Sequence, residues 1–292
     1  MEVRGERLAL AAFLVGSLLA GGNAVGVRFS NRELDPLWGA GFRFALAAAL
    51  LVGLMAVLRL SPPRGPALTG AVLYGALNFG AAFALAYYGF VRVHAGLGQT
   101  LLAIVPLVTL LLAVLQRQER FRLRALVGAV LALIGIGVLS EAPLREAVPL
   151  LSLLALLGSA FCFAQAAIVV RKFPPVHPVT MNAVGMSVAA ALLIMGSLLV
   201  DEAIMLPERP ATWFALGYLV VVGSIVVFGL YIVVLRDWSA SRAAYTFVLV
   251  PVVTVVLSAW LDDEPVRAGL VLGGALVLTG VYVGALRPAR TA

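Results

Sequence analysis

Ten long apolar stretches occupy this chain almost from end to end. Each is about twenty residues long, which matches the roughly 30 Å of hydrocarbon that a helix must cross in a bilayer. Lipid offers no hydrogen-bond partner to the backbone, and continuous apolar runs do not fit the alternating strands of a membrane barrel. The sequence therefore predicts an all-α integral membrane protein with ten transmembrane helices.

We number these predicted helices span 1 to span 10 in chain order. They cover residues 8–27, 37–58, 67–90, 95–115, 123–140, 149–170, 178–200, 212–233, 241–261 and 268–286. Arg4 and Arg7 ahead of the first run resemble a signal peptide, but the run is long and has no clear cleavage site, so we interpret it as span 1. The hinges are too short to hold a separate soluble domain.

The composition excludes several classes of function. Hydrophobic residues make up 62% of the chain and charged residues only 12%, unlike a soluble globular domain. The net charge of +7 is spread over short hinges without a basic face, so we expect no nucleic-acid partner. Cys162 is the only cysteine, and His94 and His177 lie in hinges without further ligand types, so neither a metal site nor a cofactor is expected. The expected partners are the lipid bilayer and a small-molecule substrate, and the oligomeric state stays open.

The distribution of basic residues predicts the orientation. With a cytoplasmic N-terminus, 14 of the 21 Lys and Arg residues fall on the cytoplasmic side. This excess satisfies the positive-inside rule. We therefore expect a multi-pass protein of the cell's inner (plasma) membrane with both termini in the cytoplasm.

The two halves of the chain repeat each other. A shift of 145 residues pairs Ala95 with Ala240, Pro106 with Pro251, Thr109 with Thr254, Glu119 with Glu264, Arg122 with Arg267, Gly128 with Gly273 and Gly135 with Gly280. A shift of 142 pairs Gly16 with Gly158, Pro36 with Pro178, and the string 47–51 with 189–193. Each half, 1–146 and 147–292, holds five spans, and an odd number inserts the second copy upside down. Inverted repeats are the structural basis of alternating access in many carriers.

The repeated residues also resemble a known family. The pattern runs from Pro106 through Glu119 to Gly128 and Gly137, returns at Pro251, Glu264 and Gly280, and is preceded in span 2 by Pro36 and Arg43. It resembles the EamA-type members of the drug/metabolite transporter superfamily over essentially the whole chain. The resemblance implies a ten-helix secondary transporter, often an exporter of amino acids, with a central cavity lined by spans 1, 3, 4, 6, 8 and 9. Leu18–Gly22 stands where the family commonly has a tryptophan, so an aromatic lid from that position is not expected.

Two amides are the leading candidates for substrate binding. Asn23 ends a stripe of small residues on one face of span 1, and Gln165 ends an equivalent stripe in span 6. Polar side chains in lipid need a partner, a water-lined cavity or a ligand. A cavity role is one interpretation, and hydrogen bonding between packed helices is the other.

Further candidate binding residues are polar or aromatic side chains within spans 3, 4, 8 and 9. They are Asn78, Tyr88, Gln99, Thr100, Ser224, Tyr231 and Tyr245. Tyr88 is preferred over Tyr87 because α-helical periodicity places it nearer the Asn78 face. Pro106 and Pro251 are candidate hinges because proline removes a backbone donor, although both could simply bend their helices for packing.

Charges are scarce inside the spans. Arg43 lies about two turns into span 2, where it could tie span 2 to carbonyls or to Asp35, or could bind a substrate carboxylate. No Asp or Glu lies near the middle of any span, which argues against proton coupling through a buried carboxylate. We therefore expect an uncharged vestibule lined by amides and phenols between the two halves.

The sequence favours transport over catalysis, since no hydrolase, metalloprotease or nucleotide-binding motif occurs. The predicted function is secondary transport of small metabolites by alternating access, most simply export of amino acids or related amphipathic compounds. Alternatives are a nucleotide-sugar or drug transporter of the same fold, or a membrane component that transports nothing.

Overall fold

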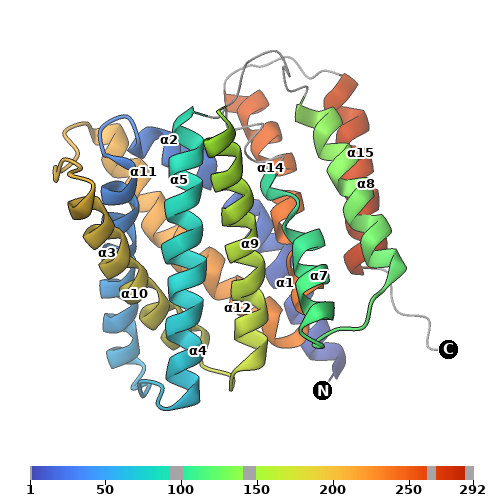
Figure 1. Ribbon diagram of the computed structural model, residues 1–292, viewed down its shortest axis with the longest axis horizontal. Helices are drawn as coiled ribbons and strands as arrows, with labels where there is room; N and C mark the ends of the chain where they lie inside the picture. Colours follow the sequence, from blue (N-terminus) through green and yellow to red (C-terminus); the bar gives the residue numbers. More distant parts are fainter. Residues whose placement is uncertain (1, 93–100, 141–148, 262–267, 287–292) are drawn as a thin grey trace.

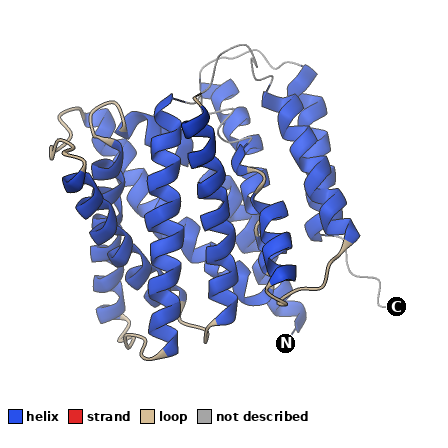
Figure 2. Cartoon of the chain, viewed as in Figure 1, coloured by secondary structure: helices blue, strands red, loops and turns tan. Residues whose placement is uncertain are grey.

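The computed structural model describes residues 2–92, 101–140, 149–261 and 268–286 (Figure 1). All regular secondary structure in these ranges is helical (Figure 2). The predicted fold class, an all-α membrane protein built from two repeats, is confirmed, and the described helices agree with ten spans. The predicted boundary between the halves, at 146/147, lies outside the described residues.

Several spans consist of more than one helical segment. The first half contains α1 (Glu2–Ala20), α2 (Asn23–Ser30), α3 (Pro36–Val57), α4 (Pro66–Tyr74), the π-helix η1 (Gly75–Ala81), α5 (Ala82–Arg92), α7 (Val105–Leu115) and α8 (Leu123–Ser140). The second half contains α9 (Leu150–Lys172), α10 (Pro178–Leu199), α11 (Pro210–Val220), the π-helix η2 (Val221–Val226), α12 (Val227–Asp237), α13 (Ala240–Ala243), α14 (Thr246–Leu261), α15 (Ala268–Val281) and the π-helix η3 (Tyr282–Leu286). Five spans of the described chain, numbers 2, 3, 6, 7 and 8, are long and apolar enough to cross a membrane by length and composition.

Equivalent spans of the two halves pack against each other in opposite directions. The backbone N–H groups of Leu37 and Trp38, at the start of α3, donate to the Glu202 carboxylate just after α10, at 3.1 and 2.7 Å. A Cβ on Gly128 in α8 would lie 2.6 Å from Gly284 Cα. One on Gly135, two turns later, would lie 2.7 Å from the backbone of Val277. The pairs α3 with α10 and α8 with α15 are therefore antiparallel, as an inverted repeat requires.

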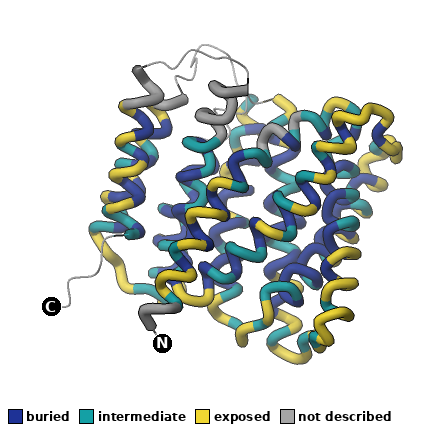
Figure 3. The backbone as a smooth tube through the Cα atoms, turned by 180° about the vertical axis from the view of Figure 1, so that it is seen from behind, coloured by how far each residue is buried: buried dark blue, intermediate teal, exposed yellow. Residues whose placement is uncertain are grey.

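The outward faces of the bundle are apolar. Figure 3 shows exposed residues along the outer sides of the helices, and many are large hydrophobic side chains such as Leu115, Leu199 and Phe214, which are 77%, 80% and 81% exposed. An apolar surface of this extent is unfavourable in water and suits a hydrocarbon environment. The surface is therefore that of a protein surrounded by lipid.

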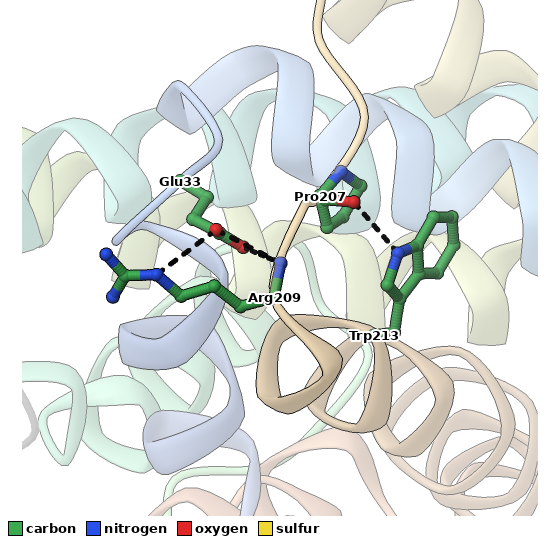
Figure 4. Close-up of polar contacts among 4 residues, drawn as sticks. All are labelled: Glu33, Pro207, Arg209 and Trp213. Atoms are coloured by element: carbon green, nitrogen blue, oxygen red, sulfur yellow. Dashed lines mark hydrogen bonds and ion pairs between the residues drawn. The ribbon is translucent and has the colours of Figure 1, made fainter.

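The chain brings different segments together at the two ends of the bundle. At one end, here called the Glu6 end, Arg242 donates to Glu6 Oε1 and Oε2 at 2.6 and 3.2 Å and to the Ala285 carbonyl. At the opposite end, the Glu33 end, the backbone N–H of Arg209 donates to the Glu33 carboxylate at 3.2 Å (Figure 4). The start of α1 and the end of η3 thus share one end, and the hinges after α2 and α10 share the other.

Candidate functional site

A cavity of about 820 Å³ lies between the two halves. Its lining includes Arg32, Asp35 and Arg92, so it reaches the Glu33 end of the bundle. One lining residue from each contributing span, in chain order, is Asn23, Arg43, Tyr87, Leu102, Phe163, Tyr231 and Phe247. These represent the six spans that the family resemblance implies, and span 2 in addition.

A break in span 1 places Asn23 at the cavity wall. The helix is interrupted at Gly21 and Gly22, between α1 and α2. A Cβ on Gly22 would lie 2.4 Å from the hydroxyl of Tyr218, which donates to the Leu19 carbonyl at 2.5 Å. A side chain at position 22 would therefore displace this phenol from its place across the helix. Asn23 follows the break, its Nδ2 donates to the Gly223 carbonyl at 3.4 Å, and its Oδ1 has no partner.

Two π-helical segments occupy equivalent places in the repeat. η1 in span 3 begins at Gly75, and η2 in span 8 begins 146 residues later at Val221. Asn78 and Ser224, both predicted binding residues, lie in these segments and are buried, but neither lines the cavity. The Ser224 hydroxyl donates to the Leu219 carbonyl at 2.8 Å and accepts a bond from Arg43 Nε at 2.8 Å. Ser224 thus acts as an anchor for Arg43.

Arg43 is fully buried and lines the cavity. Its Nε bonds Ser224 and its Nη2 donates to the Gly223 carbonyl at 3.0 Å, while Nη1 has no partner. The guanidinium lies 5.1 and 5.3 Å from the ring centroids of Phe44 and Phe83. Both ion pairs of the described residues, at Glu33 and Glu6, lie elsewhere. The expectation of an uncharged vestibule is therefore wrong, because a buried guanidinium forms part of the wall.

The aromatic hydroxyls divide between cavity and packing roles. Tyr87 and Tyr231 line the cavity, and neither hydroxyl has a hydrogen-bond partner. The predicted Tyr88 is 46% exposed and does not line the cavity. Tyr245, also predicted, is buried and donates to the Ala125 carbonyl at 2.8 Å, which ties span 9 to span 5. The sequence analysis did not select Tyr87, although Tyr87 is the same residue type as its neighbour Tyr88 and lies in the same span.

Other predicted site residues lie away from the cavity. Gln165 accepts a hydrogen bond from Gln116 Nε2 at 2.7 Å and is not among the lining residues. Gln99 and Thr100 lie outside the described residues. Pro106 is the second residue of α7, which starts directly after an interruption of span 4. Pro251 instead lies inside α14, and span 9 is interrupted earlier, at Ala244 and Tyr245.

The cavity combines aromatic walls with polar atoms that have no protein partner. Five phenylalanines line it: Phe83, Phe90, Phe163, Phe228 and Phe247. Five residues contribute buried polar atoms without partners: Asn23 Oδ1, Asn31 Oδ1, Arg43 Nη1, Tyr87 OH and Tyr231 OH. Buried polar groups normally have partners. A cavity with this lining suits a small amphipathic solute that supplies them.

Known proteins of similar sequence are transporters. The chain is 28% identical over 293 residues to a "Probable amino-acid metabolite efflux pump" of Escherichia coli (strain K12), covering 94% of this chain and 93% of that protein. It is 29% identical to a "Probable terminal-alkyne amino-acid exporter" of Streptantibioticus cattleyicolor, covering 82% and 79%. A solved crystal structure has the same fold, with a TM-score of 0.80 and 16% identity over 95% of this chain and 96% of the other.

The family model described as "EamA-like transporter family" matches the chain twice, over residues 7–141 and 150–285. The two matches together span nearly all of the chain, and each takes in five spans. The resemblance found in the repeated sequence pattern is thereby confirmed. The chain belongs to the EamA-like transporter family and is a membrane transporter, not an enzyme.

Proposed function

We propose that this protein is a secondary transporter that exports amino acids or related amphipathic compounds by alternating access. It resides in the inner membrane with both termini in the cytoplasm, the orientation that the basic residues favour. The observation that carries the proposal is the cavity between two inverted halves, with aromatic walls and unpartnered polar atoms. Two relatives, named as a probable amino-acid metabolite efflux pump and a probable terminal-alkyne amino-acid exporter, support the substrate class.

Hydrogen bonds between spans at the Glu6 end support alternating access. The Ser241 backbone N–H and hydroxyl donate to the Glu119 carboxylate at 3.0 and 2.5 Å. Arg171 Nη1 donates to the Leu235 carbonyl at 2.9 Å, linking span 6 to span 8. The cavity reaches the Glu33 end, so these contacts belong to a state open to one side. Inverted repeats can exchange such a state for one open to the other side.

Transport by the purified protein in liposomes tests the proposal. The assay measures uptake of a panel of labelled amino acids driven by their concentration gradient. We expect at least one to enter faster than in protein-free liposomes. Asn23→Ala should slow this uptake because Asn23 lines the cavity, whereas Gln165→Ala should behave as wild type because Gln165 lies outside it. Uptake equal to protein-free liposomes for every amino acid would contradict the proposal.

The same assay separates the alternatives. The phosphates of a nucleotide sugar would need several buried cations to bind them. Among the cavity-lining residues the buried cation is Arg43, which disfavours this substrate. A cationic drug calls for a buried carboxylate, and the acidic residue of the lining, Asp35, lies in the hinge after α2. Uptake of a nucleotide sugar or an organic cation in place of amino acids would establish one of these functions.

A further inference from the structure

We propose that the cavity recognises its solute through a carboxylate group, which Arg43 and Tyr87 bind together. This inference rests on the proposed function, because it assigns the chemical group that the transporter recognises in amino acids. It assigns Arg43 and Tyr87 to substrate binding, whereas the sequence left the role of Arg43 open between structure and anion binding.

Arg43 is held rigidly with one side of its guanidinium unused. Nε and Nη2 bond the two adjacent residues of η2, Ser224 and Gly223, and these two bonds fix the plane of the group. Nη1 is buried, has no partner and belongs to a side chain that lines the cavity. A buried charge without a counter-charge is unfavourable in a membrane protein. An anionic ligand would remove this penalty each time it binds.

Tyr87 adds a second donor beside the guanidinium. Its phenol interacts electrostatically with Arg43 and lies within reach of a side-chain hydrogen bond to it, although no bond of standard hydrogen-bond geometry joins the two groups. A guanidinium N–H can only donate, and a phenol O–H can donate beside it. Two adjacent donors, one of them charged, match the two oxygens of a carboxylate.

The charges along the cavity favour an anionic group. Arg32, Arg43 and Arg92 line it together with one acidic residue, Asp35. Asp35 Oδ2 accepts the Ala203 backbone N–H at 2.8 Å, so this carboxylate is occupied in tying two hinges together. The lining therefore carries a net positive charge, which would draw an anionic group toward Arg43.

Other lining atoms suit the remainder of an amino acid. Asn23 Oδ1 is a pure acceptor without a partner, and the Tyr231 hydroxyl is also unpartnered. An ammonium group has three donors and no acceptor, so these oxygens could receive it. The phenylalanine walls would contact the apolar part of the solute.

Thermal stability of the purified protein, measured with three related ligands, tests the inference. The ligands are L-phenylalanine, L-phenylalaninamide, which lacks the carboxylate, and phenylacetate, which lacks the amine together with the carbon that carries it. A ligand that binds the folded protein raises its melting temperature. We expect both carboxylates to bind wild type, and the amide to bind roughly tenfold to hundredfold more weakly than phenylalanine.

Four variants locate the effect. Arg43→Gln should abolish the preference for the carboxylate, and Tyr87→Phe should weaken carboxylate binding by roughly threefold to tenfold. Ser224→Ala removes a bond that anchors Arg43 but keeps the charge, so the preference should persist. Tyr88→Phe, on the outward face, should match wild type. If Arg43→Gln does not fold, Tyr87→Phe and the wild-type ligand series decide the question.

Several outcomes overturn the inference: equal stabilisation by the acid and the amide, an unchanged preference in Arg43→Gln, or no stabilisation by either carboxylate. Its failure is distinct from failure of the proposed function. If labelled amino acids enter liposomes but the amide competes as well as the acid, export stands and carboxylate recognition falls. If no amino acid enters but phenylacetate stabilises the protein in an Arg43-dependent way, the anion site stands and amino-acid export falls.

Discussion

Tyr87 and Tyr88 are neighbours in the chain with different surroundings. Tyr87 is 2% exposed and lines the cavity, while Tyr88 is 46% exposed on the outer surface. α-Helical periodicity predicted the opposite assignment because it assumed a regular helix from Asn78 onward. The π-helix η1 takes more residues per turn, so the residues after it lag behind the α-helical angle. This lag moves Tyr88 toward the face that α periodicity gives to Tyr87, and it turns Tyr87 toward the Asn78 face.

The two tyrosines form a matched pair for mutagenesis. Tyr87→Phe removes one hydroxyl from the cavity and should raise the KM for a transported amino acid by roughly threefold to tenfold, the value of one hydrogen bond. Tyr88→Phe makes the same chemical change on the outer surface and should leave the KM unchanged. Initial rates in liposomes measure both. A larger effect at Tyr88 would mean that the helix faces are assigned the wrong way round.

The sequence predicts which residues line the cavity only where helical periodicity alone decides which face of a helix they occupy. Asn23 and Tyr231 were predicted from sequence and line the cavity. Gln165 was predicted by analogy with Asn23, but span 1 is interrupted just before Asn23 while span 6 continues as α9. An amide after a break and an amide inside a regular helix face different directions. Such differences come from tertiary contacts such as Tyr218 against Gly22, which hydrophobic periodicity does not encode.

At the level of the helices, close approach between the halves depends on glycine. A Cβ on Gly75, at the start of η1, would lie 2.4 Å from Gly185 Cα in α10. The obstacle is backbone, which cannot move aside as a flexible side chain could. The π-helical turn of span 3 therefore packs directly on span 7. The hydropathy of the sequence predicted both spans, but neither this contact nor the π-helical turn, because both arise from packing between distant segments.

Gly75→Ala should therefore lower the melting temperature of the protein. Overpacking of this kind costs about 1–3 kcal/mol. Gly53→Ala in α3 is the control, because a Cβ there meets nothing within 4 Å and alanine favours the helix. Thermal unfolding of both variants in the same detergent measures the difference. Equal melting temperatures would contradict the close packing of η1 on α10.

Considered as a whole, the molecule is open at one end and tied together at the other. The cavity reaches the Glu33 end, while Glu119, Ser241 and Arg171 bond neighbouring spans at the Glu6 end. The repeat in the sequence predicted two inverted halves, and their antiparallel pairing follows from it. Which end is open could not be predicted, because a cavity open at either end would fit the same hydrophobic pattern.

Cysteine labelling tests this arrangement in a Cys162→Ala background. Thr246 lines the cavity and Thr279 lies on the outward face of α15, and both hydroxyls bond the preceding helical turn. Thr246→Cys should react with a membrane-impermeant thiol reagent, more slowly when substrate is present. Thr279→Cys should not react, because lipid excludes the reagent. Labelling of both positions at equal rates would mean that the cavity is not a separate aqueous compartment.

Arg43 has no counterpart in the second half of the chain. The repeat pairs it with Gly185, which packs against Gly75 and Phe79 just as Arg43 approaches Gly223 and Ser224. The two halves thus share a fold but contribute different groups. The first half provides the guanidinium of Arg43, and the second half provides the hydroxyl and the carbonyl that hydrogen-bond to it. A fusion of two first halves would bury a pair of guanidinium groups, and a fusion of two second halves would bury none. Neither half can therefore replace the other, even though the two have the same arrangement of helices.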